Sequence, residues 1–305
     1  MNILDSFIEN LYTGAPVQFK QLSVTPVFIR EEREMPYIEL DEALKGNLVE
    51  VTEVSEQGSV PTLRVVNRAD RDVIILDGEQ LVGAKQNRIV NTTVVIPARE
   101  TVEIPVTCVE QRRWHYTSDS FSDSRSHSYG SLRTLKHSSV TRSLRNTGSY
   151  TSDQGAVWGD ISAKMHRMEA ASPTMSMDDM FASSLSGEDE SQLSTEAAHQ
   201  PQQVGYFAFV RGGFAGGDVF GSSQLCRAKL DKLLRGHYLD SLDAGVEFPR
   251  LTIEQVIGQV RAAAPEQFAA VGKGAELRFE AGDVQGGWSV VDEFIPHLMV
   301  FPKLN

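Results

Sequence analysis

A chain of 305 residues with 41% hydrophobic and 23% charged content is long enough for one large domain or two smaller ones, and this composition argues against wholesale disorder. A net charge of −12 argues against binding of nucleic acid or anionic membranes by the surface as a whole. Two cysteines, Cys108 and Cys226, are too few for a disulfide framework or a four-cysteine zinc site, and no signal peptide or membrane-spanning run is recognisable. We therefore expect a reduced, cytoplasmic protein that does not engage a membrane.

The N-terminal part of the sequence has the pattern of an antiparallel β structure. A short amphipathic helix is predicted first, because apolar residues recur at helical spacing between Leu4 and Leu11. The predicted strands that follow, rich in β-branched residues and separated by turn formers, cover residues 23–30, 48–54, 62–66, 72–76, 89–96 and 101–108. Pro105 indicates an edge or a bulge, because proline cannot donate to a strand ladder. Strands this closely spaced favour a sandwich-like antiparallel arrangement over βαβ units.

Residues 117–153 differ in composition from the rest of the chain. Ser, Arg, Gly, Thr and His predominate and aliphatic residues are few, so we predict a long loop or partly disordered insertion. Within residues 111–145, seven Arg and Lys residues stand against two Asp residues. This local positive charge indicates an anionic partner and makes the segment a candidate for contact with another protein.

The C-terminal part alternates predicted helices with predicted strands. Helical spacing of apolar residues predicts a helix over residues 157–168, and the polar stretch from 183 to 203 has the composition of a flexible connection. The other predicted elements are strands at 206–210 and near 219–220, a helix from Ser222 or Ser223 to Gly236, a helix after the capping box at Thr252, and strands at 275–280, 288–291 and 297–301.

We therefore predict an α+β fold with three parts. Residues 1–116 form an antiparallel, sandwich-like β-rich half, residues 117–153 form the Ser/Arg-rich loop or insertion, and residues 154–305 form a helical and α+β half. The two halves can share one core.

The stretch from Asp77 to Arg88 concentrates carboxylates, amides, cations and two glycines between apolar, strand-like runs. Each such side chain needs a partner if buried, because an unpaired buried polar group costs roughly 1 to 3 kcal/mol and an unpaired charge costs more. We therefore predict that this segment lies outside the core and is the first place to look for a ligand site. The simpler alternative is that its charges pair with one another on a turn, with Gly78 and Gly83 present only for backbone geometry.

Two further features are considered as sites. Residues 216–223, GGDVFGSS, lead into a predicted helix, so either the helix N-terminus binds an anion or Ser222 or Ser223 simply caps the helix, and Asp218 can face the ligand or the cap. The histidines form no HExxH or HxH constellation, so no metal site is predicted, and no cofactor is identified.

Three long motifs carry a resemblance to a known family. They are ILDGEQLVGAKQNRIVNTTVVIPARETVEIPVTCVEQRRW, QGAVWGDISAKMHRM followed by SPT, and GGDVFGSSQLCRAKLDKLLRGHYLDSL. In this order they resemble the ARG and rhodanese-phosphatase-superfamily-associated protein domain family, and the likeness covers most of the chain. The resemblance implies a place in systems that handle NAD-derived or ADP-ribosylated molecules. It supplies no catalytic residue set.

A ligand related to NAD or ADP-ribose would need complementary groups on this chain. Lys85, Arg88, Arg112 and Arg113 would neutralise a pyrophosphate, Asp77 or Glu79 would accept hydrogen bonds from ribose hydroxyls, Trp114 or Tyr116 would stack a base, and Gln86 and Asn87 would add paired donors and acceptors. We therefore predict a small anionic metabolite as the partner.

Whether the ligand is processed is left open by the sequence. For hydrolysis of a glycosidic linkage the acid and base candidates are Asp77, Glu79 and Glu110, and Lys85 is an alternative nucleophile. The alternative function is a protein or RNA interaction factor that acts through residues 117–153, with steep salt dependence if RNA is the partner.

Overall fold

The computed structural model describes residues 3–55 and 58–304 and confirms the α+β prediction. In these residues eighteen strands form three sheets, which are antiparallel except for one parallel pair, and eight helices accompany them. The helices are α1 (Ile3–Glu9), α2 (Leu40–Lys45), α3 (Gly130–Thr147), α4 (Gln154–Arg167), α5 (Met177–Ser184), α6 (Gly187–Glu196), α7 (Ser223–Leu242) and α8 (Ile253–Ala262). None of these helices is both long and apolar enough to cross a membrane.

The largest sheet joins strands from both ends of the chain. Its spatial order is β1 (Leu11–Thr13), β3 (Leu22–Ile29), β13 (Gln203–Val210), β14 (Gly213–Phe220), β18 (His297–Pro302), β17 (Val284–Val290), β16 (Ala275–Ala281) and β15 (Glu266–Ala269), with β2 (Val17–Phe19) paired to β3. Strand β3 of the N-terminal half thus pairs with β13 of the C-terminal half, so the sheets do not divide at residue 116.

The two remaining sheets use residues 38–127. The six-stranded sheet has the order β12 (Phe121–His127), β8 (Glu79–Gly83), β9 (Arg88–Val90), β11 (Thr101–Cys108), β6 (Thr62–Asn67) and β5 (Val49–Glu53). The small sheet has the order β10 (Val94–Ile96), β7 (Val73–Ile75) and β4 (Ile38–Glu39), and β4 pairs with β7 in parallel. The run predicted as one strand at 89–96 is thus two strands in two sheets. Strand β11 pairs with β6 up to Pro105 and with β9 from Val106 onward.

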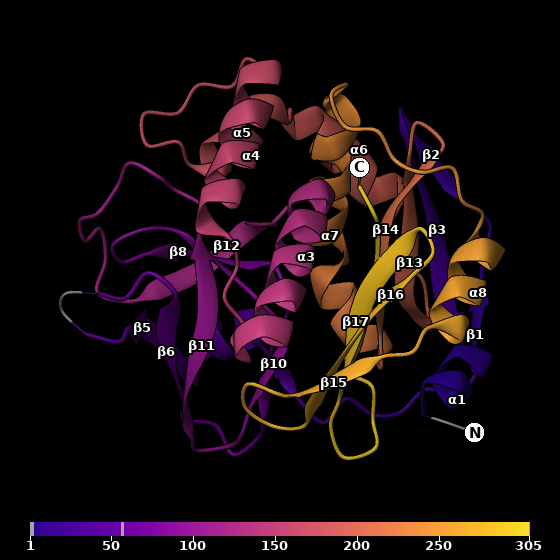
Figure 1. The fold of residues 1–305 in the computed structure, drawn as a ribbon, viewed down its shortest axis with the longest axis horizontal. Helices are drawn as coiled ribbons and strands as arrows, with labels where there is room; N and C mark the ends of the chain where they lie inside the picture. Colours follow the sequence, from indigo (N-terminus) through magenta and orange to yellow (C-terminus); the bar gives the residue numbers. More distant parts are fainter. Residues whose placement is uncertain (1–2, 56–57, 305) are drawn as a thin grey trace.

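Helices α3 and α7 lie between the six-stranded sheet and the large sheet (Figure 1). Helix α7 packs against β13 on one side and β12 on the other, and one hydrophobic cluster contains residues of both sheets and of α7, such as Ile89, Tyr206 and Leu230. Gly236 was predicted to end α7, but the helix continues to Leu242. A Cβ at Gly236 would lie 3.0 Å from the Cα of Tyr129, so this glycine allows the chain at the start of α3 to approach α7 closely.

The prediction of a loop or partly disordered insertion at residues 117–153 is wrong. This segment forms β12 at the edge of the six-stranded sheet and the 18-residue helix α3. Its cations are largely used inside the protein, because Arg133 and Lys136 are buried against carboxylates of other elements and Arg145 pairs with Glu266 and Glu280. A helix with so few aliphatic residues has no clear apolar face, so its periodicity did not reveal it.

Several local predictions are confirmed and one more is wrong. Ser222 caps α7 by accepting a hydrogen bond from the amide of Leu225, and Thr252 forms a capping box with Gln255 at the start of α8. The hairpin around Gly282 is β16 and β17. The polar stretch at 183–203, predicted as a flexible connection, instead contains α6, whose first turn is acidic as a helix N-terminus favours.

Candidate functional site

The segment from Asp77 to Arg88 is buried, and the prediction that it lies outside the core is wrong. It enters β8, turns, and returns as β9, so it lies inside the molecule beside α3 and α7. Asp77, Glu79 and Arg88 are at most 1% exposed. The turn alternative is not what the structure shows either, because Asp77 and Glu79 pair with residues of the two helices.

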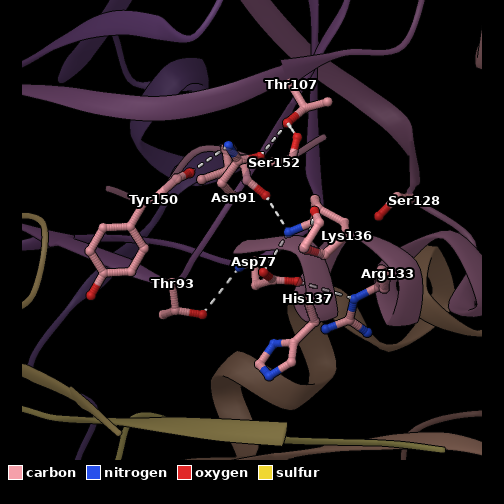
Figure 2. Close-up of polar contacts among 12 residues, drawn as sticks. Asp77, Asn91, Thr93, Thr107, Ser128, Arg133, Lys136, His137, Tyr150 and Ser152 are labelled. Atoms are coloured by element: carbon pink, nitrogen blue, oxygen red, sulfur yellow. Dashed lines mark hydrogen bonds and ion pairs between the residues drawn. The ribbon is translucent and has the colours of Figure 1, made fainter. Parts of the chain in front are cut away.

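Asp77 lies at the centre of a buried ionic cluster, the first of three in this region (Figure 2). Lys136 of α3 donates from Nζ to Asp77 Oδ2 at 2.5 Å and to the carbonyl of Val90 at 3.0 Å. Thr93 Oγ1 accepts from the Asp77 amide at 3.1 Å, and Arg133 Nε lies 3.6 Å from Asp77 Oδ1. Burial lowers the pKa of Lys136 to about 8, although Asp77 opposes this shift. The cluster lies in the interior, where neither charged group has contact with solvent.

Arg133 joins this cluster to the large sheet. Its guanidinium donates to both oxygens of Asp218 on β14, at 2.8 and 2.7 Å, and Asp218 also accepts from Tyr206 at 2.6 Å and lies 3.0 Å from His297 Nε2. Burial raises the pKa of Asp218, but Arg133 and His297 outweigh burial and hold it well below its usual range. Asp218 thus contacts Arg133, Tyr206 and His297 in the interior, whereas Ser222 caps α7.

A second cluster surrounds Lys229 of α7. Its Nζ lies 2.6 Å from Glu39, 3.0 Å from Asp41 and in hydrogen-bonding contact with Glu79. Atoms of these three carboxylates lie within 4.8 Å of one another, a spacing that could hold a metal ion. The ammonium group of Lys229 already supplies the compensating charge at this position. Its pKa is raised, because the three carboxylates outweigh the effect of burial.

Four residues that the sequence analysis considered for the ligand lie together, apart from Asp77; they are Lys85, Arg88, Trp114 and Tyr116. Lys85 Nζ is 5.5 Å from the ring centre of Trp114 and 5.0 Å from that of Tyr116. Arg88 lies 5.6 Å from the Trp114 ring and 3.6 Å from Glu53. Trp114 is 46% exposed, whereas Arg88 is buried, so of the two only the aromatic ring offers a face to solvent.

Three further predicted residues, Asn87, Glu110 and Arg113, form a third cluster. Arg113 lies 2.6 Å from Glu110 and donates to Asn87 Oδ1 at 3.0 Å, and Asn87 Nδ2 donates to Asp178 of α5 at 3.4 Å. Burial raises the pKa of Glu110, but hydrogen bonds led by that from Arg113 outweigh it, and the net shift is downward. Gln86 accepts a hydrogen bond from Arg88 at 3.2 Å and so belongs to the previous group.

A solvent-open hollow of about 430 Å³ lies between β12 and α5, and we call it the β12–α5 hollow. Its lining residues are Val82, Asp123, Ser124, Arg125, Ser126, Asp178, Phe181, Ala182, Leu185, Glu190 and Arg235. A neighbouring hollow of about 540 Å³ between α6 and α7, here the α6–α7 hollow, shares Arg125, Glu190 and Arg235 with it. The two therefore meet around the ion pair of Arg235 with Glu190.

Two of the buried clusters reach solvent at this hollow. Asp178 accepts hydrogen bonds from Asn87 at 3.4 Å and from Ser124 at 3.3 Å, so it is the outer member of the Glu110 and Arg113 cluster. Asp123 is linked through Lys232 to Asp41, which contacts Lys229. Burial raises the pKa of Asp178. Burial and the neighbouring Asp41 raise the pKa of Asp123 to about 7.

The chain as a whole can be assigned to a protein family. Comparison with known protein families matches residues 10–301 to the ARG and Rhodanese-Phosphatase-superfamily-associated Protein domain, ARPP-1. The chain belongs to this family. The lining of the β12–α5 hollow lies within the matched range, so the hollow is part of the ARPP-1 domain. No curated protein and no solved structure matches the chain.

Sequence reasoning did not single out the residues that line the hollow of the ARPP-1 domain. Asp123 and Arg125 entered only as charges in the basic window, and Asp178 was not considered. These residues share a position at the edge of the six-stranded sheet beside α5. This position can be recognised only once residues 121–127 are known to form the edge strand β12. The alternation of Ser with charged residues from Ser122 to Ser126 is the signal that was available.

The raised pKa of Asp123 predicts a specific pH dependence of stability for this ARPP-1 domain. Between its ordinary value of 3.8 and about 7, the folded protein holds a proton that the unfolded chain releases, so the free energy of unfolding falls as the pH rises through this window. Asp123 is partly exposed, and after allowance for solvent screening we expect a contribution of about 2 kcal/mol. The lowered pKa of Asp41 acts at lower pH, outside this window.

The measurement is urea unfolding of the wild type and Asp123→Asn at about pH 5 and pH 8. The wild type should lose about 2 kcal/mol relative to the variant between the two conditions, since asparagine has no proton to release. Parallel pH responses of the two proteins would show that Asp123 titrates normally.

Proposed function

We propose that this protein binds an NAD- or ADP-ribose-related ligand in the β12–α5 hollow. The observation that carries the proposal is that Asp123, Asp178 and Arg125 line one solvent-open space. Asp123 and Asp178 are suited to accept hydrogen bonds from ribose hydroxyls, and Arg125 is suited to bind a phosphate. No residue in the described ranges forms an ion pair with the side chain of Arg125, so its guanidinium is available.

The size and the shared wall of the two hollows support a ligand with a central diphosphate. Each hollow lies within the usual range of about 300 to 1,000 Å³ for small-molecule sites. Arg125 lines both of them. A diphosphate held at Arg125 would let one end of the ligand enter the β12–α5 hollow and the other end enter the α6–α7 hollow. Family membership supports this ligand class. The family is named for its association with the ARG and rhodanese-phosphatase superfamilies, and this association implies a place in systems that handle NAD-derived or ADP-ribosylated molecules.

The residues predicted from the sequence have supporting roles in this proposal. Asn87, Glu110 and Arg113 hold Asp178 in place from the interior. Asp77 and Glu79 anchor β8 to α3 and α7 through Lys136 and Lys229. Residues 117–153 contribute Asp123 and Arg125 to the hollow, and because most of their cations are used inside the fold, we do not carry forward an interaction factor acting through this segment.

The proposal also places the protein in the cytoplasm, where NAD-derived metabolites are handled. Cys108 and Cys226 are both free and buried. Burial raises the pKa of each thiol, which keeps it in the unreactive protonated form. Two unpaired cysteines fit a reducing compartment.

Calorimetric titration with ADP-ribose tests the proposed binding. We expect saturable binding by the wild type and an affinity at least about 10-fold weaker for Arg125→Ala, because a charge-assisted hydrogen bond contributes about 1.5 to 3 kcal/mol. Asp178→Asn should also weaken binding by losing an acceptor for a ribose hydroxyl. Arg99→Ala is the matched control, since Arg99 is an exposed arginine that pairs with Asp70 and lines neither hollow.

ADP-ribose, ADP and ribose 5-phosphate are titrated in parallel to separate the contributions of the ligand's parts. Absence of heat with the wild type would overturn the proposal. Equal affinities of wild type and Arg125→Ala would show that the ligand binds elsewhere.

A further inference from the structure

A hollow of about 580 Å³ lies between α3 and α4, and we call it the α3–α4 hollow. It is open to solvent, and residues 245–247 and Leu304 complete its wall. It shares no lining residue with the β12–α5 hollow or the α6–α7 hollow. Its volume lies within the range of about 300 to 1,000 Å³ that is usual for small-molecule sites. The α3–α4 hollow is therefore a separate place where a ligand can bind.

Two arginines lie at opposite ends of this hollow. Helix α4 starts beside the C-terminal half of α3, because the Asp153 amide donates to Ser139 Oγ at 3.2 Å, and Arg142 follows Ser139 by about one turn. Arg167 ends α4 at the far side, where it donates to Asp243 from Nε at 2.9 Å and from Nη2 at 2.6 Å. Arg142 is exposed, and its side chain has no ion pair or hydrogen bond with residues 3–55 and 58–304. Its guanidinium is thus available to an anion.

The wall between the two arginines offers acceptors of hydrogen bonds. Ser138 donates its hydroxyl hydrogen to Gln285 at 2.8 Å, and Ser139 donates to a backbone carbonyl of α3 at 3.0 Å. A serine hydroxyl has one hydrogen and two lone pairs, so towards the hollow these oxygens act as acceptors. Asp160 and Glu247 line the same wall and accept through their carboxylates. A ligand that fits this wall carries several donors, such as a row of hydroxyl groups.

We propose that the α3–α4 hollow binds a sugar phosphate, with the phosphate at Arg142 and sugar hydroxyls donating to Ser138 and Asp160. The carboxylate at the phosphate end, Asp153, caps α4 by accepting from the Ala156 amide at 3.0 Å, so the positive end of the helix dipole offsets its charge. A polyamine would find the same acceptors, but the unpaired charge of Arg142 would repel it. The open arginine and the acceptor wall together favour a ligand that is anionic at one end and hydroxylated along the rest.

Calorimetric titration of the full chain with glucose 6-phosphate tests this inference, with inorganic phosphate and spermidine titrated in parallel. We expect glucose 6-phosphate to bind at least about 10-fold more tightly than phosphate, because its hydroxyls add hydrogen bonds. Arg142→Ala should weaken this binding at least about 10-fold by removing a charge-assisted hydrogen bond.

Ser138→Ala should weaken glucose 6-phosphate binding by about 3-fold or more and leave phosphate binding unchanged, because only a sugar hydroxyl uses this acceptor. Arg227→Ala is the matched control, since Arg227 is an exposed arginine of α7 that lines none of the three hollows. An unchanged midpoint of urea unfolding shows that each variant is folded.

The outcomes are independent of the proposed function, because the two sites share no residue. Absence of glucose 6-phosphate binding, or equal affinities of the wild type and Arg142→Ala, would overturn the inference. Phosphate binding as tight as that of glucose 6-phosphate would show that the arginine only attracts anions, and tighter binding of spermidine would reverse the assigned charge of the ligand. Either result would make the assignment of a sugar phosphate wrong. The affinity for ADP-ribose should be the same in Arg142→Ala as in the wild type.

Discussion

Replacement of Lys229 by methionine is expected to lower the free energy of unfolding by about 3 to 5 kcal/mol at pH 7. Methionine fills a similar volume but removes the charge that faces Glu39, Asp41 and Glu79. Lys232 remains beside Asp41 and relieves only part of the resulting repulsion. The free energy of unfolding is measured by urea denaturation, and a loss below about 1 kcal/mol would show that the cluster is not an essential ionic centre.

Lys20→Met is the matched control for this variant. Lys20 also pairs with an aspartate, Asp189, but its side chain is 48% exposed, so its loss should leave the free energy of unfolding close to that of the wild type. The destabilisation in Lys229→Met should diminish as the pH falls toward about 5. The reason is that a buried carboxyl without its cation has a raised pKa, takes up a proton in the folded state and so relieves the repulsion.

Asp218→Asn is expected to cost a similar amount, about 3 to 5 kcal/mol. Among the residues that the structure describes, the change leaves the buried guanidinium of Arg133 with one carboxylate, that of Asp77 at 3.6 Å, and it weakens the acceptor for Tyr206. Asp218 belongs to β14 and Arg133 to α3, so the loss loosens the helix from the large sheet. Urea unfolding measures the effect, with Asp70→Asn, at an exposed ion pair with Arg99, as the control expected below about 1 kcal/mol.

A double-mutant cycle tests whether the cost arises from the broken pair. Arg133→Met combined with Asp218→Asn should destabilise by less than the sum of the single variants, because neither charge is then left alone. The coupling energy should be on the order of 1 to 3 kcal/mol. Additive losses would show that the two side chains act independently.

The parts of this protein that were predicted correctly are those in which neighbours in sequence interact. Ser222 caps α7 through the amide of Leu225, and Thr252 exchanges hydrogen bonds with Gln255, each within a span of three residues. The hairpin of β16 and β17 turns at Gly282, whose φ of +56° suits a glycine. Most of the strands between residues 22 and 108 were likewise evident from their β-branched residues, although β4 and β8 were not predicted.

Residues 77–88 show why prediction from neighbouring residues fails for buried charges. A carboxylate in an apolar stretch predicts a surface site when no oppositely charged residue lies nearby in the sequence. Asp77 meets Lys136 across 59 residues of sequence, Glu79 meets Lys229 across 150, and Arg133 meets Asp218 across 85. The cost of burying each charge is offset by a cation or anion that periodicity and composition cannot locate. The helix α3 was overlooked for the same reason, since its buried face is charged.

The sequence by itself therefore determined the α+β class, the family, most of the strands and the helix caps, because all of these depend on short-range pattern or on long ordered motifs. Only the tertiary structure decided that residues 77–88 are interior, that residues 117–153 form β12 and α3, and that Asp123, Arg125 and Asp178 line one hollow. The physical reason is that charge pairing and cavities are properties of surfaces brought together by folding, and a linear pattern does not record which surfaces meet.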